Sequence, residues 1–164
     1  MIDETDRQIL NILQQNARTS NAEIARQVEM APSAVLERIR RLESRGVIQG
    51  YEARIDPEAL GLGLLAFVFV RTTDFVGEER AAEALAGIPE VLEVHTITGP
   101  GDMLCRVVAR TNADLQRVID SIVAVAGVVR AATVIALDTP VPYRILPLVH
   151  AAADGTARPV GGTA

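Results

Sequence analysis

Residues 20–46, SNAEIARQVEMAPSAVLERIRRLESRG, contain two short helical patterns a few residues apart. In the first, Ser20 and Glu23 have the spacing of a capping box, in which each side chain accepts from the other residue's backbone N–H. The second begins at Pro32, which suits the first position of a helix, and ends at Gly46. Two helices joined by so short a turn predict a helix-turn-helix, a motif whose second helix enters the major groove of DNA.

The second helix of the pair has two distinct faces. At about 100° per residue, Val35, Ile39 and Leu42 fall on one apolar stripe. An ordinary three-helix core with a solvated arginine face is one interpretation of this pattern. In the other interpretation the polar side meets DNA, with Ser33, Ala34 and Glu37 at base edges and Arg38, Arg40 and Arg41 at phosphates or guanine.

A further helix upstream would complete a small core. Asp3 can cap this helix, and its apolar face would consist of Ile9, Leu10, Ile12 and Leu13. We therefore expect a helix-turn-helix domain over residues 1–50.

Charge restricts where nucleic acid could bind. The whole chain carries a net charge of −5, which excludes a uniformly basic nucleic-acid-binding protein. Within residues 33–45, however, four arginines stand against two glutamates, a local charge of +2. Only this segment is suited to phosphate, so the expected interface coincides with the second helix of the pair.

Several other classes of protein find no support in the sequence. The one cysteine, Cys105, excludes a disulfide within the chain, and its alternating apolar surroundings predict a buried side chain. The apolar run at residues 60–70 is too short to span a bilayer, and the N-terminus does not read as a signal peptide. We expect a cytoplasmic protein with no membrane partner, and we find no motif for a metal or another cofactor.

The second half of the chain is an internal repeat. VFVRT at residues 68–72 is answered by VVART at 107–111, and AGI at 86–88 by AGV at 126–128. Each copy reads as strand, helix, glycine stop and strand. We expect helices over 77–85 and 112–125, the second capped by Asn112, further strands over 91–98 and 128–137, and left-handed glycines at Gly87 and Gly127.

This β-α-β-β-α-β order predicts a ferredoxin-like domain, so the fold class is α+β. The sheet would have four antiparallel strands with both helices on one face. The other face would expose apolar side chains to water, and a second copy of the chain is the simplest cover for it. We expect an obligate homodimer that assembles further into tetramers or octamers.

Gly99, Pro100, Gly101 and Asp102 join the two copies of the repeat. These residue types are typical of a tight turn between antiparallel strands. They do not form a dinucleotide-binding fingerprint, because a third glycine and a following helix are missing. The remaining division is a linker strand and hinge over 51–61, the ferredoxin-like domain over 62–149, and a disordered tail over 150–164.

Together these features resemble the Lrp/AsnC family of feast/famine transcriptional regulators. The likeness spans roughly residues 2–149 and is carried by IDETDRQIL, the helix-turn-helix, LERIRRLESRGVIQGYEARIDPEALG and VLEVHTITGPGDMLC. It implies an N-terminal, winged-type helix-turn-helix domain that binds double-stranded operator DNA. It also implies a C-terminal domain, called RAM, that binds small effectors, commonly amino acids, and drives assembly.

The resemblance also implies a position for the effector. The turn at residues 99–102, with Thr98 and Met103 beside it, would line a site at a contact between subunits. The N–H groups of a glycine turn can hold a carboxylate and Asp102 an ammonium group, so an amino acid suits both. We add the hydroxyl of Thr133, from the last strand. Met103 and the low aromatic content favour an aliphatic or small polar ligand.

Three residues depart from the family's pattern. Glu29 stands where the family commonly has a glycine in the helix-turn-helix turn, Ala31 where it has a serine cap, and Met103 where an aromatic residue often follows the turn. A left-handed backbone at Glu29 would cost roughly 1 kcal/mol or more, and the missing cap about 1 kcal/mol. These departures leave open a ligand-binding or assembly module that does not read DNA.

A tetrapyrrole-binding, decarboxylase-like enzyme of similar fold is a further alternative. Such enzymes use histidine and other polar residues, and this chain has two histidines, His95 and His150. His95 lies in the alternating pattern VLEVHTIT, which is typical of a packed or interface residue. The sequence shows no Ser-His-Asp set, so we expect a regulator rather than an enzyme.

Overall fold

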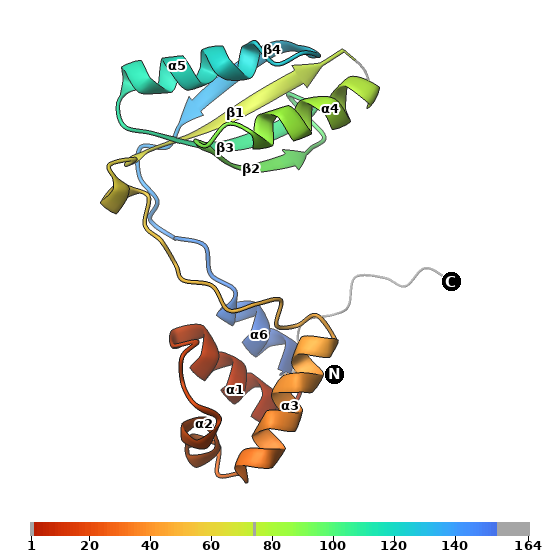
Figure 1. The fold of residues 1–164 in the computed structure, drawn as a ribbon, viewed down its shortest axis with the longest axis vertical. Helices are drawn as coiled ribbons and strands as arrows, with labels where there is room; N and C mark the ends of the chain where they lie inside the picture. The colour runs from red at the N-terminus through yellow and green to blue at the C-terminus, as the bar shows by residue number, and fades with distance from the viewer. Residues whose placement is uncertain (1, 74, 154–164) are drawn as a thin grey trace. The chain divides into compact units, whose positions relative to one another are not determined.

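The computed structural model describes residues 2–73 and 75–153. The described residues form two compact units, one of residues 2–54 together with 141–153, the other within residues 55–140. Figure 1 shows the helical unit in red to orange with a blue helix beside it, and the sheet unit in yellow, green and blue. In this division the chain returns to the first unit after its last strand, at residue 141, whereas the sequence predicts a boundary at residue 149.

The first unit contains the three expected helices, α1 (Glu4–Gln15), α2 (Asn21–Gln27) and α3 (Pro32–Ser44). Their apolar faces meet in one core. The apolar stripe expected for α3 is confirmed, because its three members are buried together with residues of the other two helices: Val35, Ile39, Leu42, Ile9, Ile24 and Ala25.

Side-chain caps fix where the first two helices begin. Asp3 caps α1 in a complete capping box with Asp6. The Ser20 hydroxyl accepts from the Glu23 N–H at 3.2 Å, as expected. The expected second bond of the capping box, from the Ser20 N–H to the Glu23 carboxylate, is replaced. The Glu23 carboxylate accepts instead from the side chains of Arg26 and Gln27.

The turn between α2 and α3 keeps a left-handed backbone. Glu29 has a φ of 53° and is the only residue other than glycine with a positive φ in the described part of the chain. The next residue, Met30, donates its N–H to the Ala25 carbonyl at 2.9 Å and closes the turn. Ala31 is the N-cap of α3 and makes no side-chain cap bond. The turn therefore forms despite both departures, each of which leaves a local energetic cost.

Gly46 ends α3 with a φ of 68°, as expected. Between α3 and the sheet, the only regular element is the short 3₁₀ helix η1 (Glu58–Leu60). The expected linker strand over residues 51–61 is wrong. The described residues of the first unit also contain no strand from which a β-hairpin wing could be built. A strand must pair its backbone groups with a second strand, and these residues have none beside them.

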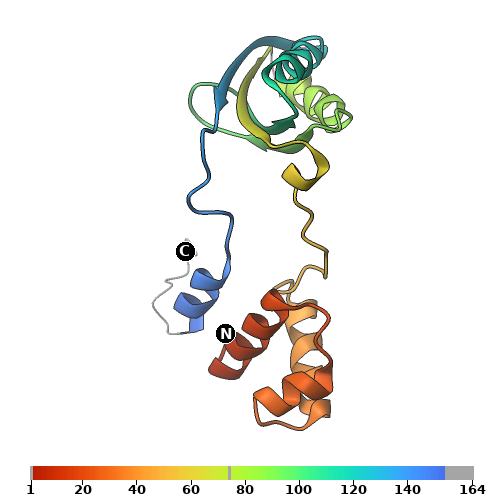
Figure 2. The same ribbon diagram turned by 90° about the vertical axis from the view of Figure 1, so that its left-hand side faces the viewer.

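The sequence patterns do not predict α6 (Leu146–Ala153), which packs along α1 (Figures 1 and 2). Its sequence, LPLVHAAA, is apolar on almost every side and so has no helical period. The expected disordered tail is thus helical over residues 150–153, and residues 154–164 lie outside the described residues. None of the described helices combines the length and the apolar character that a membrane crossing requires.

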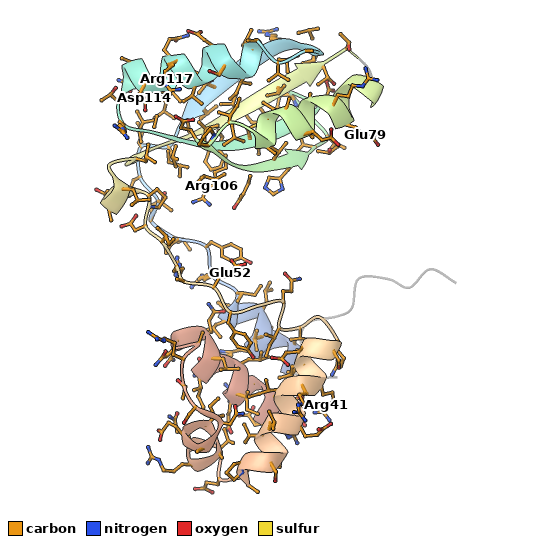
Figure 3. All side chains as sticks on the ribbon, viewed as in Figure 1. Arg41, Glu52, Glu79, Arg106, Asp114 and Arg117 are labelled. Atoms are coloured by element: carbon orange, nitrogen blue, oxygen red, sulfur yellow. The ribbon has the colours of Figure 1, made fainter. Side chains whose placement is uncertain are left out.

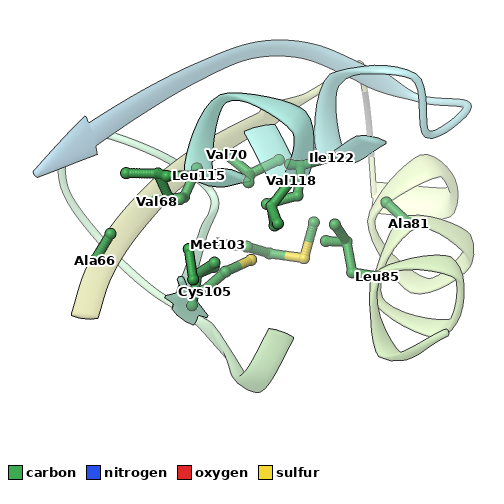
Figure 4. Close-up of a cluster of buried hydrophobic side chains, with 12 residues drawn as sticks. Ala66, Val68, Val70, Ala81, Leu85, Met103, Cys105, Leu115, Val118 and Ile122 are labelled. Carbon is green, nitrogen blue, oxygen red and sulfur yellow. The ribbon is translucent and has the colours of Figure 1, made fainter. Parts of the chain in front are cut away.

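The second unit is a four-stranded antiparallel sheet with the strand order β2-β3-β1-β4. Its helices α4 and α5 pack on one face, and the core between sheet and helices is drawn in Figure 4. This arrangement confirms the ferredoxin-like fold. In chain order the elements are β1 (Leu64–Thr72), α4 (Phe75–Ala86), β2 (Val91–Thr96), β3 (Met103–Ala109), α5 (Asn112–Val123) and β4 (Val128–Ile135).

Three local expectations for this unit meet different outcomes. The cap of α5 is Thr111 rather than Asn112, and its hydroxyl accepts from the Asp114 N–H at 3.1 Å. Gly127 has the expected left-handed backbone with a φ of 92°, but Gly87 does not, so that expectation is wrong. Cys105 is fully buried as expected, and burial raises the pKa of its thiol to about 11.

The face of the sheet away from the helices carries apolar side chains. Along β1, buried residues alternate with half-buried ones, and Phe67 and Phe69 lie on the side opposite the core. The strand register places Val134 beside Phe67 and Leu104 beside Phe69. Val134 is 55% exposed. The face that was expected to need a cover therefore carries a group of apolar side chains, with Arg106 and Glu93 beside them on the same face.

Candidate functional site

The six residues assigned to DNA lie on α3, but they differ in how available they are. Arg41, labelled in Figure 3, has a side chain 49% exposed, whereas the side chain of Arg38 is 23% exposed. Of the other four side chains, that of Ala34 is half-buried, and the remaining three are exposed: Ser33, Glu37 and Arg40.

Arg38 and Arg41 bind a buried carboxylate of α1. Asp6 is fully buried and is the only charged residue so buried in the described part of the chain. Arg38 Nη1 donates to Asp6 Oδ1 at 2.7 Å, and Arg41 Nη2 donates to both Asp6 carboxylate oxygens at 3.2 Å. An unpaired charge in this position would be strongly destabilising, so the two arginines stabilise the packing of α1 on α3.

Asp3 joins this cluster from the start of α1. Its Oδ2 accepts from Arg38 Nη1 at 2.7 Å, while its Oδ1 accepts from the Asp6 N–H at 2.8 Å. The Arg38 guanidinium, followed by the Asp6 N–H, lowers the pKa of Asp3, and Asp3 and Asp6 raise the pKa of Arg38. The sequence patterns missed this cluster. The available signal was that Asp6 stands on the apolar stripe of α1, three residues before Ile9, where a carboxylate is uncommon unless it is paired.

Arg40 has a different environment from its two neighbours. Its side chain makes no hydrogen bond or ion pair with any residue that the structure describes. It borders a surface hollow of about 260 Å³ between the helices, together with Tyr51. The Tyr51 hydroxyl donates to Glu43 Oε1 at 2.9 Å, and desolvation, followed by the Glu43 carboxylate, raises its pKa to about 12. Arg40 is therefore available to an external anion, and the segment after α3 is held against that helix.

The turn between β2 and β3 is tied to the end of β1. The Ile97 N–H donates to the Asp102 carbonyl, and the Asp102 N–H donates to the Val70 carbonyl, both at 2.9 Å. Gly99 has a φ of 132°, a conformation that favours glycine. At Gly101 a Cβ would lie 2.9 Å from the Val70 carbonyl oxygen, so only glycine fits. The sequence expectation of a tight turn is confirmed.

Polar groups remain available on this turn. The N–H groups of Gly99 and Gly101 donate to none of the described residues. Asp102 Oδ2 accepts from the Thr72 N–H at 2.8 Å and from the Thr72 hydroxyl at 3.3 Å, while its Oδ1 has no partner among them. The Pro100 carbonyl accepts from Arg71 at 3.4 Å. Asp102 therefore has a structural role at the end of β1 and still offers one carboxylate oxygen.

Two residues expected at the effector site do not lie on the surface of the turn in the single chain. Met103 is fully buried, and its side chain packs in the core beneath the helices (Figure 4). It therefore does not present its side chain at the surface of the turn, so the expectation of an aliphatic or small polar ligand rests on the low aromatic content alone. Thr133 is half-buried and pairs with Val68 in the middle of β1, one strand away from β3. Thr98, Gly99 and Pro100 are exposed, and Gly101 is buried.

A second surface hollow, of about 370 Å³, lies at the start of α5. Arg117 lines it and donates to Asp114 Oδ1 at 2.8 Å and to Glu90 (Figure 3). The Arg110 N–H and the Arg117 guanidinium lower the pKa of Asp114. Arg117 is thus neutralised within its own unit. Residues 98–103 line neither this hollow nor the one beside Arg40.

Comparison with known proteins identifies both units. An AsnC-type helix-turn-helix domain matches residues 2–43, and an Lrp/AsnC ligand binding domain matches residues 65–146. The chain belongs to the Lrp/AsnC family. It is 38% identical to the HTH-type transcriptional regulator FL11 of Pyrococcus horikoshii over 138 residues, which cover 84% of this chain and 91% of that protein.

Solved structures of Lrp/AsnC regulators share the fold. A transcriptional regulator of Neisseria meningitidis in complex with L-Met matches with a TM-score of 0.82 and 32% identity over 92% of this chain and 99% of that one. The feast or famine regulatory protein of M. tuberculosis complexed with L-methionine matches with a TM-score of 0.78 and 34% identity over 88% and 98%. This Lrp/AsnC chain is accordingly a transcriptional regulator with a helix-turn-helix domain and a ligand-binding domain.

Proposed function

We propose that this regulator reads operator DNA with α3 and responds to an amino acid bound at the glycine turn, between subunits of a homodimer. The observation that carries the DNA-reading role is the outward side of α3. Arg40 has no partner among the described residues, and Arg41 is half exposed, on a segment with a local charge of +2. Phosphate contacts position such a helix, and base contacts from its outward side chains give specificity.

Binding to DNA tests this role. The probe is a duplex selected from a random-sequence library by the unsubstituted protein, compared with a shuffled duplex of the same composition. An Arg40→Ala, Arg41→Ala double variant should bind the selected duplex about tenfold or more weakly. Arg80→Ala, which removes an exposed cation from α4, is the matched control and should bind normally.

Two results would contradict the DNA-reading role in different ways. Undiminished affinity of the double variant would remove α3 from the interface. Failure of the unsubstituted protein to enrich any sequence would favour the assembly module that does not read DNA.

The effector proposal is supported by the chemistry of the turn. Gly99 offers an exposed N–H donor to a carboxylate, the N–H of the buried Gly101 has no partner among the described residues, and Asp102 offers one oxygen to an ammonium group. An amino acid carries both of these groups. Two structural relatives were solved with L-methionine, so L-methionine is our first candidate. The turn is exposed at Thr98, Gly99 and Pro100, which suits a site completed by a second subunit.

A thermal-shift screen over the twenty amino acids tests the effector, because a ligand that binds only the folded protein raises the melting temperature. Asp102→Asn keeps an acceptor for the Thr72 N–H but loses the charge, so it should abolish the shift. Thr72→Val removes only the hydroxyl that meets Asp102 and is the control; it should keep the shift. A normal response in Asp102→Asn would place the effector elsewhere.

A second copy of the chain is the proposed cover of the open sheet face. Phe67, Phe69, Leu104 and Val134 lie together there and would otherwise face water. A two-fold dimer would also present two α3 helices to paired half-sites in DNA. Assembly into tetramers or octamers is the further step that we expect.

A further inference from the structure

We propose that Asp6 is a positioning residue for DNA recognition, whose buried carboxylate presets the Arg38 and Arg41 guanidinium groups on α3. This inference rests on the proposed DNA-reading role of α3. The two arginines reach the same carboxylate from successive turns of the helix, Arg38 at 2.7 Å and Arg41 at 3.2 Å. No other charged side chain in the described part of the chain is as deeply buried as Asp6.

The two arginines would use this support differently. Arg38 is the more buried and also binds Asp3, so its guanidinium is occupied within the protein. Arg41 uses only Nη2 for Asp6, and its side chain is 49% exposed. A guanidinium has five N–H donors, so the Nε–H and Nη1 groups of Arg41 remain for a phosphate or a guanine. Arg41 thereby bridges a fixed anion inside the protein and an anion outside it.

Preset geometry lowers the entropic cost of binding. A free arginine must give up much of its rotamer freedom when it grips DNA, whereas Arg41 is already held by Asp6. Arg40 provides the contrast within the same helix, because it has no partner among the described residues. We infer that Arg41 supplies an oriented contact and Arg40 a mobile positive charge.

Removal of the Asp6 charge should change sequence-independent binding and the oriented Arg41 contact in opposite directions. Its negative charge lies beneath a face that meets phosphate, so its removal should strengthen sequence-independent binding. Loss of the preset Arg41 geometry should weaken the oriented contact. The ratio of affinities for specific and shuffled DNA should therefore fall. A purely electrostatic role would raise both affinities together, and a purely structural role would lower the melting temperature without changing the ratio.

The experiment compares Asp6→Asn with Glu4→Gln. Both remove one negative charge from the first turn of α1, but Glu4 is exposed and binds Arg7 and Gln8 of its own helix. The probes are the duplex selected by the unsubstituted protein and its shuffled counterpart, at several salt concentrations. The affinity ratio should fall about tenfold in Asp6→Asn, the size of one oriented contact, and stay unchanged in Glu4→Gln.

Asp3→Asn provides a second route if Asp6→Asn does not fold. Asp3 is half exposed, and asparagine caps a helix as well as aspartate does, so the fold should persist. Without the Asp3 charge, Arg38 Nη1 depends on Asp6 alone and competes with Arg41 for the same carboxylate, so the hold on Arg41 weakens and the ratio should fall a few-fold. An unchanged ratio in folded Asp6→Asn, or in Asp3→Asn when Asp6→Asn is unfolded, overturns the positioning role. Failure of the unsubstituted protein to select any duplex would instead overturn the proposed function.

Discussion

Replacing Glu29 by glycine should stabilise the helix-turn-helix unit. Glu29 has a φ of 53°, and its exposed side chain makes no hydrogen bond or ion pair with the described residues that glycine would lose. The left-handed backbone costs an L-residue roughly 1–2 kcal/mol, which glycine avoids. The greater conformational freedom of glycine in the unfolded chain offsets about 0.5–1 kcal/mol of this gain in stability. The free energy of unfolding should therefore rise by up to about 1.5 kcal/mol, which raises the Tm of a unit of this size by up to about 6–12 °C.

Glu29→Ala is the matched control, because alanine loses the carboxylate but keeps a Cβ on the same left-handed backbone. Native-state hydrogen exchange of the α3 amides reports on this unit separately from the sheet unit. Exchange should slow in Glu29→Gly and change little in Glu29→Ala. Equal protection in the two variants would refute the backbone explanation and assign the effect to the lost charge.

Three further predictions follow from local geometry. Ala31→Ser should supply the missing cap of α3 and stabilise the same amides by about 1 kcal/mol; unchanged exchange would show that this helix end needs no cap. Phe67→Glu should place a charge on the open sheet face and prevent the proposed homodimer, so that the variant sediments as a monomer at micromolar concentration, whereas a dimer of the variant would move the interface elsewhere. The Arg38 guanidinium lowers the folded-state pKa of Asp3 below its unfolded value of about 4, so this carboxylate stabilises the unit above that pH. The contribution is lost as the pH falls through the lowered value, and Asp3→Asn should flatten this acid limb.

Features set by neighbouring residues were predicted well from the sequence. The burial of Val35, Ile39 and Leu42 follows from their helical spacing alone. Gly46 and the turn at residues 99–102 follow from the backbone conformations that glycine permits. The repeat in the second half predicted the ferredoxin-like sheet, because each copy carries its own strand and helix periods.

Features set by distant partners were not predicted. Met103 was assigned to the surface of the turn, but a shift of one residue in a strand exchanges the two faces, and β3 begins with this side chain in the core. Asp6 was overlooked because its partners, Arg38 and Arg41, lie more than thirty residues away in the sequence. In α6 the apolar residues have no period, so only its packing against α1 defines it as a helix.

The covalent connections between the units suggest how an effector could change DNA binding. Asp102 holds Thr72 at the end of β1, and the start of β1 continues from the segment that follows α3. β4 pairs with β1 and leads through residues 136–145 to α6, which packs on α1. A change at the turn that displaces β1 therefore has two covalent routes to the helix-turn-helix unit.

The connection from β4 to α6 can be lengthened without altering the glycine turn or α3. Insertion of a Gly-Ser pair after Asp138, between β4 and α6, should reduce the factor by which the effector changes DNA affinity. Effector affinity in the absence of DNA should stay the same, because the turn is unaltered. By linkage, DNA must change effector affinity by the same factor, so titrations in both directions measure one quantity. An unchanged factor in the insertion variant would show that the route through β1 and the segment after α3 carries the coupling alone.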